Sequence, residues 1–175
     1  ISYTPEANYH GSDSFVVQVN DGQGGGDSIT VNVDIAAVND APSFAEGDKV
    51  TVAMSEDGSP TLFNLTLHAS DVDGDELAWS IVTQASHGTA IASGTGETKA
   101  ISYTPEANYH GSDSYVVRVE DGQGGSDSII VNVEIEAVND APNLTEGETI
   151  TVSMSEDGSP TMFALTLHAS DADGD

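Results

Sequence analysis

The sequence predicts an all-β fold in which two β-sheets pack face to face, and this fold recurs along the chain with a period of 100 residues. Three observations support the prediction: apolar and polar residues alternate over short segments, Gly- and Asp-rich turns separate those segments, and the whole pattern repeats. Residues 1–75 align without a gap on residues 101–175, and 58 of these 75 positions are identical. Repetition of this kind is typical of tandem structural units.

The string Val-Asn-Asp-Ala-Pro occurs at residues 38–42 and again at 138–142, and it marks the expected boundaries between units. Pro fixes its own φ and favours extended geometry in the residue before it, so the string suits a stiff linker. Residues 41–140 then form one complete unit. Residues 1–40 would be the C-terminal part of a preceding unit, and residues 141–175 the N-terminal part of a following unit. We expect a fragment whose incomplete end units could associate with those of a neighbouring molecule.

Seven segments of the complete unit show the period of two that is typical of half-buried strands. In chain order they lie at residues 50–54, 63–69, 77–81, 89–92, 101–103, 115–119 and 129–135. Turn sequences such as Asp73-Gly74 and Asp121-Gly122 separate them. Seven strands in about 100 residues is the number expected of an immunoglobulin-like sandwich, with Trp79 at the centre of its core. A β-helix is a poorer match because its repeats are much shorter.

Charge and composition narrow the possible partners. The chain has 30 acidic residues and three basic ones, Lys49, Lys99 and Arg118, which gives a formal net charge of −27. Such a field repels nucleic acid and attracts divalent cations, although it would also serve solubility alone. Without Cys, neither a disulfide nor a thiolate metal site is possible. No apolar run approaches the roughly 18 residues of a membrane span, so none is expected.

Acidic and amide side chains gather where the predicted strands end. The four clusters follow the first, second, sixth and seventh strands, at residues 55–58, 71–75, 121–122 and 139–140, and a looser group at 106–113 precedes the sixth strand. Calcium takes six to eight oxygen ligands at about 2.3–2.6 Å and tolerates irregular geometry. Each cluster alone is also an ordinary turn sequence, in which a carboxylate accepts a nearby backbone N–H. Their recurrence at strand ends favours calcium.

The order of these clusters is similar to that of cadherin repeats, which share calcium between neighbouring units. Those repeats carry a Glu near the first strand, an Asp-x-Asp after the second, an Asp before a Gly-rich turn, and an acidic linker ending in Ala-Pro. Glu56, Asp71-Val72-Asp73, Asp121 and residues 38–42 stand at the matching places. The tract from Tyr103-Thr104-Pro105 to Asp113-Ser114-Tyr115 more closely resembles the cadherin-like tandem repeats of large secreted bacterial adhesins of the RTX type.

The resemblance implies Ca²⁺ at two junctions. The Asp-Arg-Glu motif of animal cadherins is missing before the sixth strand, so the choice between two acidic residues stays open at each junction, as does the number of ions. The implied ligands of the first junction are Asn39, Asp40, Asp71, Asp73 and Asp121, with Glu6 or Asp13. Those of the second junction are Glu56, Asn139, Asp140, Asp171 and Asp173, with Glu106 or Asp113. Each set is incomplete: the first lacks a Glu56 equivalent and the second an Asp121 equivalent.

The predicted function is that of a calcium-rigidified extender repeat in a large extracellular, surface-attached bacterial adhesin, acting in cell adhesion and biofilm formation with neighbouring repeats of the same chain as its partners. The alternative is a carbohydrate-binding module of a polysaccharide-acting protein, for which Tyr9 and Tyr109 are the best exposed aromatic candidates. The spacing after Asp71 does not match an EF-hand loop, because Gly74 falls at the fourth position instead of the sixth. No nucleophile motif appears, and an enzyme is not expected.

Overall fold

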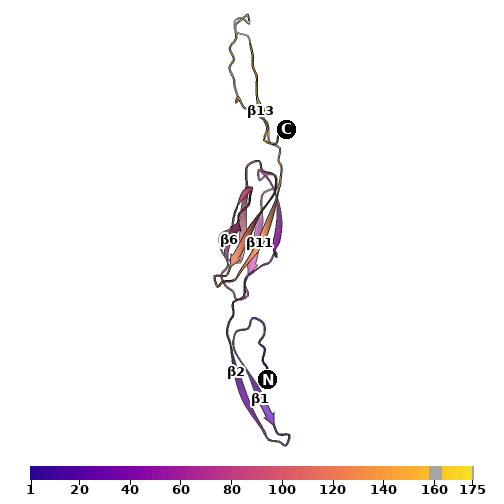
Figure 1. The fold of residues 1–175 in the computed structure, drawn as a ribbon, viewed down its shortest axis with the longest axis vertical. Helices are drawn as coiled ribbons and strands as arrows, with labels where there is room; N and C mark the ends of the chain where they lie inside the picture. The colour runs from indigo at the N-terminus through magenta and orange to yellow at the C-terminus, as the bar shows by residue number, and fades with distance from the viewer. Residues whose placement is uncertain (158–162, 175) are drawn as a thin grey trace.

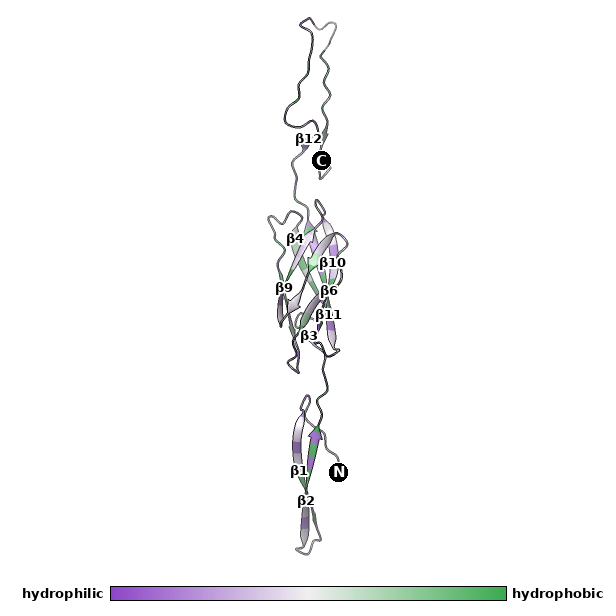
Figure 2. Cartoon of the chain, turned by 90° about the vertical axis from the view of Figure 1, so that its left-hand side faces the viewer, coloured by the Kyte–Doolittle hydropathy of each residue, from purple (hydrophilic) through white to green (hydrophobic). Residues whose placement is uncertain are grey.

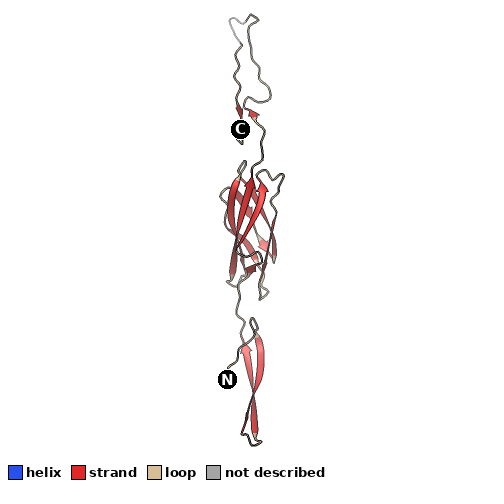
Figure 3. Cartoon of the chain, turned by 90° about the vertical axis from the view of Figure 1, so that its right-hand side faces the viewer, coloured by secondary structure: helices blue, strands red, loops and turns tan. Residues whose placement is uncertain are grey.

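The computed structural model describes residues 1–157 and 163–174, and it is elongated. A β-sandwich lies in the middle, with a two-stranded segment at each end (Figures 1 and 3). The chain enters the sandwich at one pole and leaves it at the opposite pole (Figure 1). No helix occurs in the described residues, and none of them therefore forms a helix long and apolar enough to cross a membrane.

The strands follow the alternation in the sequence. Their bounds are β1 Gly11–Asn20, β2 Gly26–Ile35, β3 Ser43–Phe44, β4 Lys49–Ser55, β5 Leu65–Ser70, β6 Ala78–Thr83, β7 Gly88–Ile91, β8 Gly94–Thr95, β9 Thr98–Pro105, β10 Gly111–Glu120, β11 Ser126–Glu136, β12 Asn143–Leu144 and β13 Ala169–Ser170. All seven strands predicted between residues 41 and 140 are confirmed. The two-residue strands β3 and β8 were not predicted, because a period of two cannot be recognised in so few residues.

Two sheets form the sandwich. One has the strand order β4-β11-β10-β6-β8 and the other β3-β5-β9-β7. The strands of each sheet pair antiparallel, except that β4 pairs parallel with β11 from Lys49↔Ile130 to Ser55↔Glu136. Because β4 and β11 come from opposite ends of the unit, this pairing fixes their relative position and brings Ser55 and Glu136 to the same pole. The predicted all-β, immunoglobulin-like sandwich is confirmed.

The core contains the inward-facing residues of both sheets. Trp79 is 4% exposed and packs edge-on against Phe44, with 5.6 Å between the ring centroids, while its indole Nε1 donates to Gly96 O. The inward positions of β10 and β11 are fully buried, and green and purple residues alternate along the strands in Figure 2. Burial of this apolar surface contributes roughly 25 cal/mol per Å² and is the main source of the sandwich's stability.

The two end segments repeat the local structure of the sandwich without its second layer. The hairpin of β1 and β2 has the same register as that of β10 and β11, from Gly11↔Ile35 to Asn20↔Gly26. Val19 is 67% exposed there, whereas its counterpart Val119 is completely buried. The difference shows that the inward faces become buried only when the opposite sheet is present.

Candidate metal centres at the two junctions

The first junction lies at the pole where the chain enters the sandwich. We define it by the carboxylates and amide that gather there: Asn39, Asp40, Asp71, Asp73, Asp75 and Asp121. The turn after β5 brings three of them together, because Asp71 Oδ1 accepts the backbone N–H of Asp73 at 2.8 Å and of Asp75 at 3.5 Å. One carboxylate oxygen from each of Asp71, Asp73 and Asp75 lies within 4.8 Å of the others.

Asp121 joins this group from the loop between β10 and β11. Its Oδ1 accepts backbone N–H groups of the Gly-rich loop at 2.7–2.9 Å, and Asn39 Nδ2 of the linker donates to its Oδ2 at 2.8 Å. The bond from Asn39, opposed by burial and aided by the loop N–H groups, lowers the pKa of Asp121. A side chain at Gly125 would collide with this carboxylate and with Ala41, so the loop requires glycine there.

The linker also contacts the turn directly. The backbone N–H of Asp40 donates to Asp73 Oδ2 at 2.7 Å. The Glu6–His10 loop of the preceding segment borders the same hollow as Asp40 and Asp73. The first junction is therefore built from the preceding segment, the linker and the sandwich together.

Electrostatic repulsion is concentrated at the first junction. Burial and the neighbouring carboxylates of Asp71, Asp121 and Asp73 raise the pKa of Asp75. Asp71 Oδ2 is buried and accepts no hydrogen bond from any described residue. A buried carboxylate oxygen is normally paired with a donor or a metal, so this oxygen is available as a ligand.

The second junction lies at the opposite pole, and we define it by Glu56, Asp57, Asn139, Asp140, Asp171 and Asp173. Glu56 directly follows β4, and its side chain is only 1% exposed. Its Oε1 accepts the backbone N–H of Val138 at 2.7 Å. Its Oε2 is buried and has no hydrogen-bond partner in the described parts of the chain, the nearest basic group being His110 Nδ1 at 3.8 Å. Asn139 Nδ2 donates within the linker, to Asp140 O.

Asp140 is surrounded by other carboxylates at this pole. Its backbone N–H donates to Asp173 Oδ2 at 2.6 Å, and Asp173 N in turn donates to Asp171 Oδ1. The pKa of Asp140 is raised by burial and then by four neighbouring carboxylates, Asp57, Asp173, Glu56 and Asp171. Asp140 Oδ2 is a second buried oxygen without a partner among residues 1–157 and 163–174.

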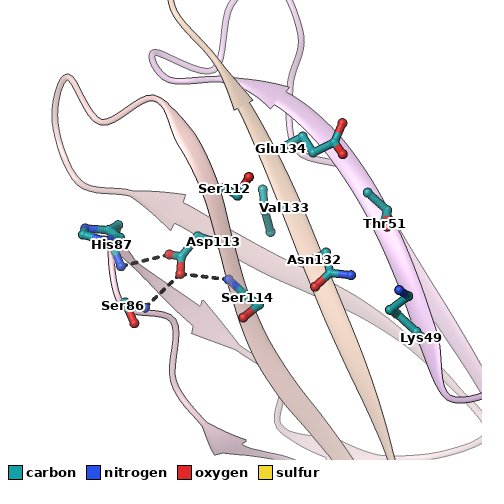
Figure 4. Close-up of a pocket in the computed structure, with 10 residues that line it drawn as sticks. All are labelled: Lys49, Thr51, Ser86, His87, Ser112, Asp113, Ser114, Asn132, Val133 and Glu134. Carbon is teal, nitrogen blue, oxygen red and sulfur yellow. Dashed lines mark hydrogen bonds between the residues drawn. The ribbon is translucent and has the colours of Figure 1, made fainter.

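Asp113 is engaged by four hydrogen bonds within the sandwich. It is 7% exposed and accepts the N–H groups of Ser86, His87 and Ser114 (Figure 4) and the hydroxyl of Tyr103, all at 2.8–3.0 Å. Burial opposes its ionisation, but these donors, with Ser86 the largest, lower the pKa of the Asp113 carboxyl. Its oxygens are occupied by bonds that tie β9, β10 and the β6–β7 loop together.

Glu106 lies in the exposed loop after β9. Its Oε2 is 3.7 Å from His87 Nδ1, and its side chain is 65% exposed. Tyr109 of the same loop stacks on His87, with ring centroids 4.0 Å apart. In the preceding segment, Asp13 accepts hydrogen bonds from Tyr3 Oη and the N–H of Ser14, while Glu6 borders the first junction.

Sequence reasoning did not assign Asp57 and Asp75 as ligands. Both belong to clusters that the sequence shows, but the resemblance to cadherin repeats points only to Glu56, Asp71 and Asp73 in those clusters. The signal that could have found them is the density of charge, since Asp75 ends the run Asp71-Val72-Asp73-Gly74-Asp75 and Asp57 follows Glu56.

Comparison with known proteins identifies the family. A family model described as a bacterial Ig domain matches residues 1–34 and 39–134, which is more than half of the chain. The chain therefore belongs to the bacterial Ig domain family. Protocadherin Fat 1 of Homo sapiens is 31% identical over 153 residues, which are 83% of this chain and 3% of that protein. The chain thus spans a very small part of this relative.

Solved cadherin structures share the fold. The extracellular cadherin domains 1–5 of protocadherin gamma B2 match with a TM-score of 0.53 and 18% identity, over 93% of this chain and 32% of that one. The EC3–6 structure of protocadherin gamma B7 gives the same TM-score and identity, over 93% of this chain and 43% of that one. At this identity, the similarity supports the cadherin-like arrangement of the strands.

Proposed function

We propose that this chain is a structural repeat of a large extracellular bacterial surface protein, and that calcium at its junctions stiffens the array. The observation that carries the proposal is the second junction: Glu56 Oε2 and Asp140 Oδ2 are buried oxygens without donors among the described residues, and Asp140 lies among four further carboxylates. Buried carboxylates are stable only when they are paired, protonated or bound to a metal. The local oxygen-rich chemistry suits Ca²⁺, which prefers carboxylate and carbonyl ligands.

The residues present fit such an ion at both poles. At the first junction Asp71, Asp73, Asp75 and Asp121 would hold it, with Asn39 and Asp40 of the linker. At the second junction Glu56, Asp57, Asp140, Asp171 and Asp173 would hold it, with Asn139. We propose Glu106 instead of Asp113 as the remaining acidic ligand, because the oxygens of Asp113 are already engaged by four donors. Likewise, we propose Glu6 instead of Asp13 as the acidic ligand from the preceding segment at the first junction, because both oxygens of Asp13 already accept hydrogen bonds.

The mechanism follows from the repulsion between these side chains. Without a cation, the carboxylates from one unit, the linker and the next unit repel one another across a few ångströms, and bending of the linker separates them. A bound cation removes the repulsion and ties the three parts into one geometry. Extracellular modules of this kind bind calcium at about 10⁻⁴ to 10⁻³ M, so the array would become rigid outside the cell. Rigidity over a long array suits a surface adhesin that holds cells to a substrate or within a biofilm.

Calcium titration tests this function. The midpoint of thermal unfolding should rise with calcium, because a ligand that binds only the folded state stabilises it by about 2.7 kcal/mol at 100 times its Kd. Small-angle scattering should show a larger and better defined maximum dimension in calcium than in chelator. The double variant Glu56→Gln/Asp121→Asn, which keeps side-chain size at both junctions, should lose both effects. If calcium leaves unfolding and maximum dimension unchanged in the unmodified chain, the proposal is wrong.

Polysaccharide binding is the second candidate function. A groove of about 540 Å³ runs along the outer face of β4, β11 and β10, and it is lined by hydrogen-bonding side chains that include Lys49, Ser112, Asn132 and Glu134 (Figure 4). Retention on insoluble polysaccharide that is lost in both Asn132→Ala and Tyr109→Ala would favour this function. Equal passage of all three proteins through the polysaccharide would exclude it for that polymer.

A further inference from the structure

The parallel pairing of β4 with β11 determines how the sandwich carries tension. The amino ends of both strands lie at the entry pole and their carboxyl ends at the exit pole, with seven residue pairs from Lys49↔Ile130 to Ser55↔Glu136. The incoming linker leads through β3 into the amino end of β4, and the outgoing linker continues from the carboxyl end of β11 (Figure 1). Tension along the array therefore pulls the two strands in opposite directions along their own axes.

In this geometry, tension acts on all seven β4–β11 residue pairs at the same time. Strands that are pulled along their axes in opposite directions cannot separate pair by pair, because every hydrogen bond between them is strained at once. The ladder extends beyond the assigned strands at both ends, since Ile130 N donates to Asp48 O at 3.0 Å and Glu56 N donates to Glu136 O at 3.1 Å. Within the described structure, β4 is an edge strand whose strand partner is β11, so its sliding past β11 is the shortest route to rupture.

Glu56 adds a side-chain bond at the end of this ladder. Its backbone N–H bonds to Glu136 O, and its Oε1 accepts the N–H of Val138, two residues further along the outgoing chain. The side chain is 1% exposed, so water competes little for these bonds. One residue at the end of β4 thus holds the chain that leaves β11 at two successive points, where the load enters.

We infer that the β4–β11 ladder is a shear-loaded clamp that bears tension along the array, and that Glu56 is its latch. The clamp depends on backbone pairing and on Glu56 Oε1, and it operates without any cation. A second statement rests on the proposed function: if Glu56 also ligates calcium, cation binding reinforces the latch, and one residue couples the rigidity of the junction to the strength of the unit.

Single-molecule stretching tests the direction of loading. The full chain is stretched through its two ends and, separately, through Asp48→Cys and Ser128→Cys, both exposed positions at the entry end of the two strands. The chain has no native Cys, so attachment is specific. The second geometry opens the same ladder one pair at a time, and it should require several-fold lower force, since forced unfolding follows the unfolding barrier along the pulled direction. Equal rupture forces in the two geometries would overturn the clamp.

Two variants of Glu56 test the latch in chelator. The Glu56→Gln side chain keeps an oxygen that can accept from Val138 N, whereas Glu56→Ala leaves that partly buried donor without its side-chain partner. Under constant load, Glu56→Ala should unfold roughly 10-fold faster than the unmodified chain, and Glu56→Gln should unfold at nearly the unmodified rate. Circular dichroism and thermal melting of both variants establish that the sandwich is folded before loading. A Glu56→Ala rate equal to the unmodified rate would overturn the latch.

Calcium separates this inference from the proposed function. In calcium, the unmodified chain should unfold more slowly than in chelator, and Glu56→Gln should lose that increment while keeping its rate in chelator. If calcium has no effect on any form but Glu56→Ala still weakens the unit in chelator, the clamp and latch stand and the calcium function fails.

Discussion

The two junctions have closely similar sequences but are bound to the sandwich in different ways. At the first junction, the linker bonds only to the unit that follows it among the described residues, through Asp40 N to Asp73 and Asn39 to Asp121. At the second, the linker bonds to both sides, through Val138 N to Glu56 and Asp140 N to Asp173.

The state of the carboxylates differs accordingly. Asp121 of the first junction is surrounded by donors, which lower its pKa. Among the described residues, the first junction has one buried carboxylate oxygen without a donor, Asp71 Oδ2, whereas the second has two, Glu56 Oε2 and Asp140 Oδ2. The donors hold Asp121 in place without a cation. If the proposed calcium sites exist, we therefore expect the second junction to depend more strongly on the cation.

The largest expected effect is selective loss of binding at one junction. Glu56→Gln should weaken calcium binding at the second junction roughly 10-fold or more and leave the first unchanged, and Asp121→Asn should do the reverse, because each removes a charged ligand from one pole. Backbone amide resonances of Gly58 and Gly124 in NMR titrations report on the two poles separately. Equal weakening at both poles by either variant would contradict the separation of the sites.

Asp113 and Asp13 form the next comparison, since they occupy the same position in two units. Asp113→Asn should reduce the free energy of unfolding by about 1–3 kcal/mol at pH 7, because a buried, charged acceptor of four bonds is lost. Asp13→Asn should cost much less, since Asp13 is exposed. Denaturant unfolding in chelator measures the loss of unfolding free energy in each of the two variants.

The same variants predict a pH dependence. The folded-state pKa of Asp113 is lowered, so its contribution is complete above the unfolded-state pKa of about 3.9 and is lost as the pH falls through the lower folded-state value. The difference in unfolding free energy between the unmodified chain and Asp113→Asn should therefore shrink on acidification from pH 7 to about pH 3. A difference that stays constant over this range would mean that the ionised carboxylate is not what stabilises the fold.

A smaller effect is expected from Asp75, which the cadherin-like pattern does not include. Asp75→Asn should weaken calcium binding at the first junction by only about 2- to 5-fold, since solvent screens the interactions of partly exposed charges. Asp57→Asn is the matched change at the second junction. The NMR titration described for Glu56 measures both, and an unchanged affinity in Asp75→Asn would remove this residue from the ligand set.

The smallest expected effect is the change in thermal stability when salt screens the repulsion between acidic side chains. In chelator, raising ionic strength from about 0.01 to 0.15 M shortens the Debye length from about 30 to 8 Å and should raise the thermal midpoint by about 1–4 °C, because the net charge of −27 destabilises the fold. Tetramethylammonium chloride avoids specific binding of small cations. A fall in the midpoint would show that attractive ion pairs outweigh repulsion in this chain.

Much of the fold could be predicted from the sequence because alternation and turn chemistry are local. The strands ending at Ser55, Ser70 and Glu120 precede acidic turns, and strand ends meet at the poles of a sandwich, so the grouping of carboxylates could also be anticipated. The parallel register of β4 and β11 could not, because it joins strands about 80 residues apart and no local pattern encodes it. The four donors to Asp113 likewise come from three separate segments.

The bonds on either side of the second linker have a consequence for how an array bends. Val138 is tied to the unit before it and Asp140 to the unit after it, in each case through the backbone N–H group. Four backbone torsions, φ and ψ of Val138 and of Asn139, lie between these two anchored N–H groups and would form the hinge of the junction. In an array of such units, bending would therefore concentrate in two residues of every hundred.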